Sequence, residues 1–190
     1  MMLNEMRVFV AIDIGSIEVL EKLSRFRDFI VSTGADLKPV DNENLHVTIR
    51  FIGEVPVRIV TEICNNLLKI VFKPFKIHVR GVGAFPSVTK PRVVWAGVSE
   101  GADELIKIHD EVENMVRKLG IPPDRERFIP HITLARVRSD RGLSELAKII
   151  AENYNYDFGE FVVKEIVLKK SILTPSGPIY SNICSVKAIE

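Results

Sequence analysis

The sequence predicts an α+β fold, and three observations lead to this prediction. Segments with strand-like and helix-like patterns follow one another in the order β-α-β-α-β-β-α-β-α-β-β along the 190 residues. Short turn sequences separate two pairs of strands, which indicates antiparallel hairpins. One short motif recurs on a strand in each half of the chain. No low-complexity linker or run of five charges divides the sequence, so residues 1–190 are expected to form one domain, or two small lobes that share a core.

The first half of the chain begins with two strand–helix units. Residues 7–13 are rich in β-forming side chains, and apolar residues at helical spacing follow over residues 17–30. A second strand is expected over residues 45–52. The helix after it, over residues 57–71, begins next to Pro56, and proline suits the first turn of a helix.

The remaining elements are a hairpin, two helices and three further strands. Strands over residues 75–82 and 91–98 flank a Phe-Pro-Ser loop, and the sequence Gly81-Val82-Gly83 is expected to bend the chain at the end of the first of them. The last expected elements are helix 102–119, strand 129–137, helix 142–153, one long strand over residues 161–173 and, after a Pro-Ser-Gly-Pro turn, strand 179–188.

The two halves share the sequence His-apolar-Thr-apolar. It occurs at residues 46–49 and again 85 positions later, and both copies lie on predicted strands. Because side chains alternate along a strand, His46 and Thr48 share one face, and His131 and Thr133 do the same. Two such strands related by an approximate two-fold axis would place two imidazoles and two hydroxyls around one cleft.

This set of side chains suits phosphoryl chemistry without a metal ion. One imidazole can take a proton from the attacking water or hydroxyl while the other protonates the leaving oxygen. Histidine titrates at about pH 6.5, so a neutral and a protonated ring can coexist near neutral pH. The threonine hydroxyls can bond the nonbridging oxygens as charge develops. A single His-x-Thr is a common accident on a half-exposed strand, but two copies at equivalent places favour an active site.

These motifs resemble the 2H phosphoesterase superfamily, and in detail its RNA 2',3'-cyclic phosphodiesterase branch, also called 2'-5' RNA ligases. The similar stretches follow the family's order along nearly the whole chain, at residues 7–13, 44–54, 92–97, 128–136 and 173–180. The resemblance implies a bilobal α+β fold in which two antiparallel sheets, related by a pseudo-two-fold axis, line a central cleft with helices packed outside. It implies hydrolysis of RNA 2',3'-cyclic phosphates to 2'-phosphates with no metal ion or other cofactor, and weak, reversible 2'-5' joining of RNA ends.

The resemblance also implies roles for individual residues. His46 and His131 match the acid/base pair, and Thr48 and Thr133 match phosphate ligands. We leave the roles within the histidine pair open, with a preference for His131 as the base. Arg136 matches an arginine that is expected to contact phosphate. Strict alternation places it on the opposite face from His131, so this role requires a bulge or the strand end just before Arg136.

Other residues are candidates for contacts to RNA outside the phosphate. Phe9 and Phe128 could stack on bases, since aromatic stacking tolerates any base, and the alternative for both is ordinary core packing. Arg7, Arg50 and Arg92 could steer or clamp the RNA backbone, although exposed arginines are common on any protein surface.

Composition narrows the class of protein. Twenty-six basic against 25 acidic residues give a net charge of +1, which excludes the cationic field of a duplex-coating protein and requires any RNA contact to be local. No apolar stretch approaches membrane-spanning length, so we expect a soluble, cytoplasmic protein, by default a monomer.

Cys64 and Cys184 are expected on a helix and a strand as buried, reduced thiols. Glutamine is absent, a bias that indicates a heat-loving source.

Several alternatives remain beside this hypothesis. His78 and His109 carry no motif and are expected to be structural or surface residues, and a zinc site on His46 and His131 lacks a third ligand. The Gly81-Val82-Gly83 sequence is too short for a dinucleotide fingerprint.

The cleft predicted between the two His-x-Thr strands could bind RNA ends or another phosphorylated ligand without catalysis. It could also act on a small cyclic phosphate from tRNA-splicing metabolism, whereas the main hypothesis takes RNA ends such as tRNA halves.

Overall fold

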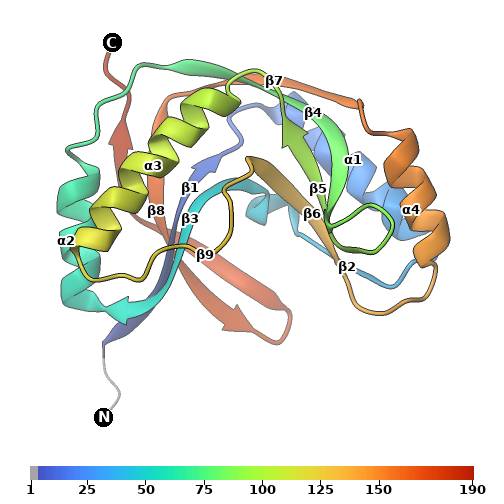
Figure 1. Ribbon diagram of the computed structural model, residues 1–190, viewed down its shortest axis with the longest axis horizontal. Helices are drawn as coiled ribbons and strands as arrows, with labels where there is room; N and C mark the ends of the chain where they lie inside the picture. The colour runs from blue at the N-terminus through green and yellow to red at the C-terminus, as the bar shows by residue number, and fades with distance from the viewer. Residues whose placement is uncertain (1–3) are drawn as a thin grey trace.

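The computed structural model describes residues 4–190, which form one strongly curled, nine-stranded antiparallel sheet with four α-helices (Figure 1). The predicted α+β class is confirmed. In chain order the elements are β1 (Glu5–Asp13), α1 (Ile17–Ser32), β2 (Leu37–Pro39), the 3-10 helix η1 (Asn42–Asn44), β3 (His46–Pro56), α2 (Val57–Leu67), β4 (Phe75–Pro86), β5 (Pro91–Val98), α3 (Ala102–Lys118), β6 (His131–Val137), α4 (Leu143–Glu152), β7 (Asp157–Val163), β8 (Glu165–Thr174) and β9 (Gly177–Lys187).

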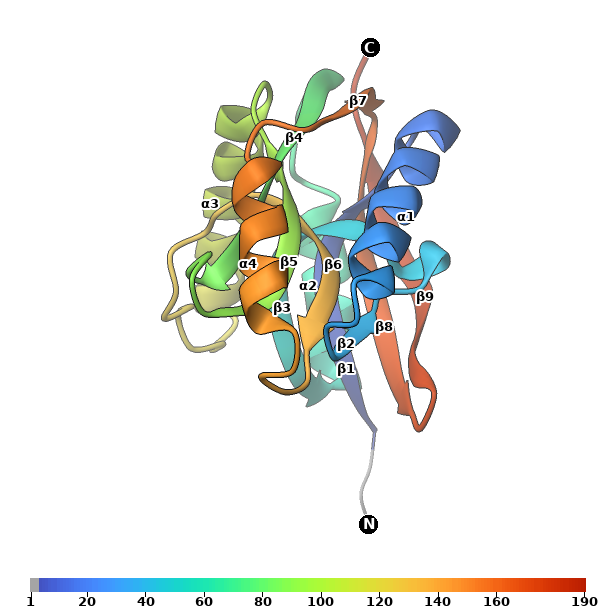
Figure 2. The same cartoon turned by 90° about the vertical axis from the view of Figure 1, so that its right-hand side faces the viewer.

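The strand order β7-β4-β5-β6-β3-β1-β8-β9 makes the two halves of the chain interleave, with short β2 paired to β6. Two units of the chain have the same arrangement of elements, first β1-α1-β3-α2-β4 and then β5-α3-β6-α4-β8. In the sheet, β3 and β6 lie side by side in the middle. Outward from β3 come β1 and β8, and outward from β6 come β5 and β4. Helices α1 and α4 pack on the half that holds β4 to β7, and α2 and α3 pack on the other half (Figures 1 and 2). Within residues 4–190 no helix is long and apolar enough to cross a membrane.

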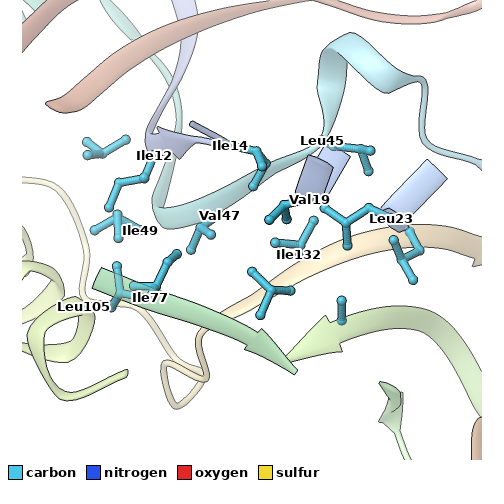
Figure 3. Packing of buried hydrophobic residues seen from close by; sticks show 14 of the residues in the cluster. Ile12, Ile14, Val19, Leu23, Leu45, Val47, Ile49, Ile77, Leu105 and Ile132 are labelled. Atoms are coloured by element: carbon cyan, nitrogen blue, oxygen red, sulfur yellow. The ribbon is translucent and has the colours of Figure 1, made fainter. Parts of the chain in front are cut away.

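A single apolar cluster lies between the helices and the sheet. Figure 3 shows Val47 of β3 and Ile132 of β6 among its members, and both side chains are fully buried. Burial of such side chains contributes about 1.5–3 kcal/mol each relative to exposure. The residues before and after Val47 and Ile132 therefore point to the other face of the sheet, which the helices leave uncovered and which we call the open face.

Most predicted elements are confirmed within a few residues, and three details differ. The long strand expected over residues 161–173 is two strands, β7 and β8, which separate at Lys164 and lie beside different partners, β4 and β1. The short β2 and η1 were not predicted. The bend at Gly81 lies inside β4 and not at its end, because a register shift there lets the strand continue to Pro86.

The expectation that Cys64 and Cys184 are free thiols is wrong. They lie on a helix and a strand as predicted, but a disulfide joins them, with their Cα atoms 6.1 Å apart. The bridge fixes α2 to β9, the last strand of the chain and an edge of the sheet. Sequence alone did not reveal it because nothing local indicates that a helix of the first half packs against a strand 120 residues later.

Candidate active site

The two His-x-Thr tetrads lie side by side in the centre of the sheet. Val47 of β3 is paired with Ile132 of β6, and this pair joins the two halves of the sheet. Since both side chains point into the core, the flanking residues point to the open face. The flanking residues are His46 and Thr48 on one strand and His131 and Thr133 on the other. The structure thus brings together four residues that the sequence singled out.

His46 is held in one orientation by its neighbours. Its Nδ1 lies 2.6 Å from the carbonyl oxygen of Asn44, which can only accept, so Nδ1 carries the proton and Nε2 is the free base. Nε2 lies 2.8 Å from Oγ1 of Thr48, whose hydroxyl donates to it. The rings of Phe9 and Tyr180 pack against the imidazole at 5.1 and 5.5 Å between centroids. These contacts limit rotation of the ring and exclude water from one side of it.

His131 has the equivalent surroundings in the other half. Its Nδ1 lies 2.6 Å from the carbonyl oxygen of Ile129, two residues earlier, which sets the same tautomer as in His46. The ring of Phe85 packs edge-on at 4.9 Å, and that of Trp95 lies at 6.1 Å. Within residues 4–190 no protein atom hydrogen-bonds Nε2 of His131, so this nitrogen is accessible to a bound reactant on the open face.

The pKa values of both histidines are lowered. Burial is the main cause for each, because it penalises the charged imidazolium, and the hydrogen bond to the backbone carbonyl opposes it. The positive charges of Lys169 and His131 lower the pKa of His46 further, while Asp13 raises it. Arg136 lowers the pKa of His131. His131 thus acts electrostatically on His46, as expected for two rings in one site.

Arg136 reaches the open face through a bulge. In the pairing of β5 with β6, Val94 lies opposite Ala135 and Trp95 opposite Thr133, which leaves Leu134 as an extra residue. Leu134 and Ala135 are both buried, so alternation resumes one step late and exposed Arg136 shares the face of Thr133. The bulge that the predicted role of Arg136 required is therefore present.

The candidate RNA-contacting residues lie in different environments. Phe9 is buried beneath His46 and Tyr180 and so belongs to the wall of the site. Phe128 is not beside the histidines: its ring stacks on His109 of α3 at 4.4 Å, with an interplanar angle of 4°. Sequence reasoning missed Tyr180, which follows the predicted Pro-Ser-Gly-Pro turn on β9.

The three candidate arginines also differ. The guanidinium of Arg7 lies 4.6 Å above the ring of Phe51 on the open face. Arg50 is buried and forms an ion pair with Glu113 of α3. Arg92 is exposed and pairs with Asp140 at 3.0 Å in the loop before α4. Of the three, Arg7 is the one whose side chain lies on the open face of the sheet.

The other two histidines lie outside this site, as expected. Nε2 of His78 lies 2.7 Å from Oδ1 of Asp157. His78 also shares a neighbourhood with Glu100 and Glu160, but Nζ of Lys76 lies within 3.5 Å of both carboxylates and offsets part of their negative charge. His109 is buried under Phe128.

Comparison with known sequences points to one family. The family model described as LigT-like phosphoesterase matches residues 14–95 and 97–180. A relative from Aeropyrum pernix, named RNA 2',3'-cyclic phosphodiesterase, is 47% identical over 167 residues, which cover 88% of this chain and 95% of the relative. A relative of the same name from Archaeoglobus fulgidus is 40% identical over 178 residues, covering 94% and 98%. These relatives come from thermophiles, in agreement with the absence of glutamine here.

Solved structures show the same fold. A crystal structure of a protein from Thermus thermophilus superimposes with a TM-score of 0.80 at 28% identity, covering 96% of this chain and 97% of that one. Escherichia coli LigT, crystallised with 3'-AMP, superimposes with a TM-score of 0.79 at 22% identity, covering 98% and 100%.

Proposed function

This chain belongs to the LigT-like phosphoesterase family, and from that premise we propose that it is an RNA 2',3'-cyclic phosphodiesterase. Relatives that match along most of the chain carry this name. The observation that carries the proposal is the pairing of Val47 with Ile132, because it puts both tetrads side by side on the open face. A phosphate between β3 and β6 can then be reached by both imidazoles.

The substrate phosphate is held by groups that stabilise negative charge. The hydroxyls of Thr48 and Thr133 and the guanidinium of Arg136 bind nonbridging oxygens, whose charge increases as the phosphorus becomes pentavalent. The aromatic rings around each histidine keep this region poor in water, which strengthens the hydrogen bonds to the phosphate.

The two histidines transfer protons on opposite sides of the phosphorus. Nε2 of His131 takes a proton from water as the water oxygen bonds to phosphorus. His46, protonated, gives its Nε2 proton to the 3' oxygen as the bond between that oxygen and phosphorus breaks. The products are a 2'-phosphate and a free 3'-hydroxyl. His131 suits the role of base because its Nε2 has no hydrogen-bond partner within residues 4–190, whereas Nε2 of His46 accepts from the hydroxyl of Thr48.

The same acid/base chemistry with a different nucleophile joins RNA ends. If a 5'-hydroxyl of a second RNA replaces water, it attacks the cyclic phosphate and a 2'-5' linkage forms, with the strain of the cyclic ester driving the reaction. The reaction consumes no nucleoside triphosphate. We include this weak, reversible ligation in the proposal, with tRNA halves as RNA ends of the required kind, the cytoplasm as the place of action and a monomer as the acting unit.

The decisive experiment uses an RNA oligonucleotide that ends in a 2',3'-cyclic phosphate, incubated with the protein in excess chelator. We expect conversion to the 2'-phosphate, separated chromatographically from the 3'-phosphate standard. Formation of the 3'-phosphate, or loss of activity that added metal restores, contradicts the mechanism. An absolute requirement for ATP in the joining of ends contradicts the ligation scheme.

Two further outcomes decide between the alternatives. If the oligonucleotide binds and is recovered unchanged, the protein is a binding module for RNA ends. If a nucleoside 2',3'-cyclic monophosphate is opened with the same kcat/KM as the oligonucleotide, the substrate is a small cyclic phosphate and the longer RNA plays no part.

A further inference from the structure

Asn44 joins two parts of the site through two different groups. It lies in η1, two residues before His46, and is 6% exposed. Its backbone carbonyl accepts the hydrogen bond from Nδ1 of His46, and its side-chain Nδ2 donates to the backbone carbonyl of Pro178 at 3.0 Å. Pro178 lies two residues before Tyr180, whose ring packs against the imidazole of His46. One buried residue therefore contacts both the histidine and the strand that covers it.

The hairpin of β8 and β9 carries Tyr180 and lies at the edge of the sheet, where β9 pairs only with β8. Two contacts fix this hairpin away from its turn. The disulfide of Cys184 joins it to α2, and Nζ of Lys169 lies 3.0 Å from Oδ1 of Asp13 on β1. Neither contact involves the tip of the hairpin, residues 172–179, which therefore needs an anchor of its own.

The tip of the hairpin is held weakly by packing. Leu173 is 64% exposed and Ile179 is 58% exposed, so little apolar surface is buried there. Over residues 4–190, the bond from Asn44 to Pro178 is the one side-chain hydrogen bond that joins the tip to an element outside the hairpin. Because β9 has no second neighbouring strand, this bond sets where Tyr180 lies.

The other half of the site has no equivalent of this contact. The position two before His131 is Ile129, which has the same backbone carbonyl contact but no side chain that can donate. The rings of Phe85 and Trp95, which pack against His131, come from β4 and β5, two interior strands that pair with each other. The ladder between these strands positions both rings, whereas Tyr180 lies on an edge strand.

We propose that Asn44 is a positioning residue for His46, with its amide holding Tyr180 over the imidazole and its carbonyl orienting the ring. This inference rests on the proposed function. The side chain of Asn44 is buried and donates to Pro178, so Asn44 acts through the two rings and not on the substrate. Without the amide, the carbonyl of Pro178 loses its donor, the tip of the hairpin moves, and water enters beside the imidazole.

The first test is the effect of Asn44→Ala on the opening of an RNA 2',3'-cyclic phosphate. Misplacement of a catalytic group by about 1 Å costs up to about 100-fold in rate, so kcat should fall by about 10- to 100-fold. KM should change by less than about threefold, because no contact to the substrate is removed. In a Tyr180→Ala background the same substitution should lower kcat by less than about threefold, because residues that act through one another are not additive.

The second test needs no turnover. Burial is the main cause that lowers the pKa of His46, so exposure of the ring should raise this pKa towards its ordinary value of 6.5. The charged groups that act on the ring, Lys169, Asp13 and His131, lie on other strands and are left in place by the substitution. NMR titration of the histidine rings in the substrate-free protein should therefore show a higher pKa for His46 in Asn44→Ala and an unchanged pKa for His131.

Asn153, which follows α4, is the matched control. Its amide also donates to a backbone carbonyl, that of Ile149 at 2.8 Å, and α4 packs on β4 and β5 in the other half of the sheet. Asn153→Ala should therefore leave both kcat and the pKa of His46 at their wild-type values. Chemical denaturation reports how far each variant is destabilised. If Asn44→Ala does not fold, Asn44→Ser, whose side chain is also too short to reach Pro178, takes its place in both tests.

The outcomes separate this inference from the proposed function. The inference is overturned if the folded Asn44 variant keeps the wild-type kcat and the wild-type pKa of His46. It is also overturned if the losses from Asn44→Ala and Tyr180→Ala multiply in the double variant. If the wild-type protein does not open the cyclic phosphate, the proposed function fails, whereas the titration still decides whether Asn44 positions Tyr180 over His46.

Discussion

Arg50 of β3 and Glu113 of α3 form a buried ion pair that links the strand of His46 to the loop before His131. Nη2 of Arg50 donates to the carbonyl of Pro122 at 2.7 Å. The other carboxylate oxygen of Glu113 accepts from the backbone N–H of Asp124 at 3.0 Å. Burial opposes ionisation of Glu113, but the hydrogen bond from Arg50 and those from Asp124 and Arg117 lower its pKa to about 2.

This pair predicts that Arg50 acts on stability and not on RNA binding. Arg50→Met removes the buried partner of Glu113, which keeps only the half-exposed Arg117 and the backbone N–H of Asp124, and should lower the free energy of unfolding by about 3 kcal/mol. Combining it with Glu113→Leu should recover part of the loss. Chemical denaturation measures both, and a changed KM for RNA with unchanged stability contradicts this role.

Since the pKa of Glu113 is about 2 when folded and near 4.5 when unfolded, the pair's contribution to the free energy of unfolding is complete above pH 4.5 and disappears as the pH falls towards 2.

The lowered pKa values of both histidines predict the pH dependence of the reaction. The base must be neutral and the acid protonated, so kcat/KM has a bell-shaped dependence on pH. Its two limbs report the pKa values of the two groups in the free enzyme. Because the pKa values of both histidines are lowered from 6.5, the maximum of the kcat/KM profile should fall on the acidic side of pH 6.5. Bound phosphate favours the imidazolium forms, so the bell for kcat should lie at higher pH than that for kcat/KM. Steady-state kinetics across the pH range measures both curves, and a plateau that extends to alkaline pH contradicts paired acid/base catalysis.

The bulge at Leu134 predicts a role for Arg136 that its neighbour does not share. Charge-assisted hydrogen bonds are worth about 1.5–3 kcal/mol, so Arg136→Ala should reduce kcat/KM by about 10- to 100-fold. Arg136→Lys should restore part of this, because a lysine retains the charge but not the planar fork. Arg138, exposed just beyond the end of β6, is the matched control. Equal effects of Arg136→Ala and Arg138→Ala indicate a general charge effect and contradict the specific contact.

The disulfide predicts a large contribution to stability. It closes a segment of 120 residues, and the loss of chain entropy on closing a loop of that length corresponds to about 5 kcal/mol. Cys64→Ser or Cys184→Ser should lower the free energy of unfolding by about 2–5 kcal/mol. Reductant should lower the stability of the wild-type protein to the same level and leave either variant unaffected. Identical denaturation curves for the wild type with and without reductant mean that the bridge contributes nothing.

Local patterns in the sequence were sufficient for most of the site. Alternation along two strands placed His46 with Thr48 and His131 with Thr133, and the requirement for a bulge before Arg136 came from the same rule. These predictions succeed because the period of a strand is a local property. The strand expected over residues 161–173 shows the limit, since a continuous run of β-forming residues does not reveal that the chain leaves one half of the sheet and joins the other at Lys164.

Residues whose role depends on distant neighbours could not be placed from the sequence. Arg50 was a candidate for contact with the RNA backbone, and only the packing of α3 shows that a buried carboxylate is its partner. Phe128 precedes His131 by three residues, yet it stacks on His109 of α3. Phe51 lies in the first motif, but the bulge at Ile49 that turns it to the open face is visible only in the pairing of β3 with β1.

The measurement that tests the account most directly is the single-turnover rate of cyclic-phosphate opening in His46→Ala and His131→Ala, each in excess chelator and at saturating protein. Each histidine contributes a proton transfer, so each variant should be slower by about 10²–10⁴-fold. Removing both should cost much less than the product of the two losses, since they act as one unit. If either single variant retains more than about a tenth of the wild-type rate, two-histidine catalysis at the junction of β3 and β6 is wrong.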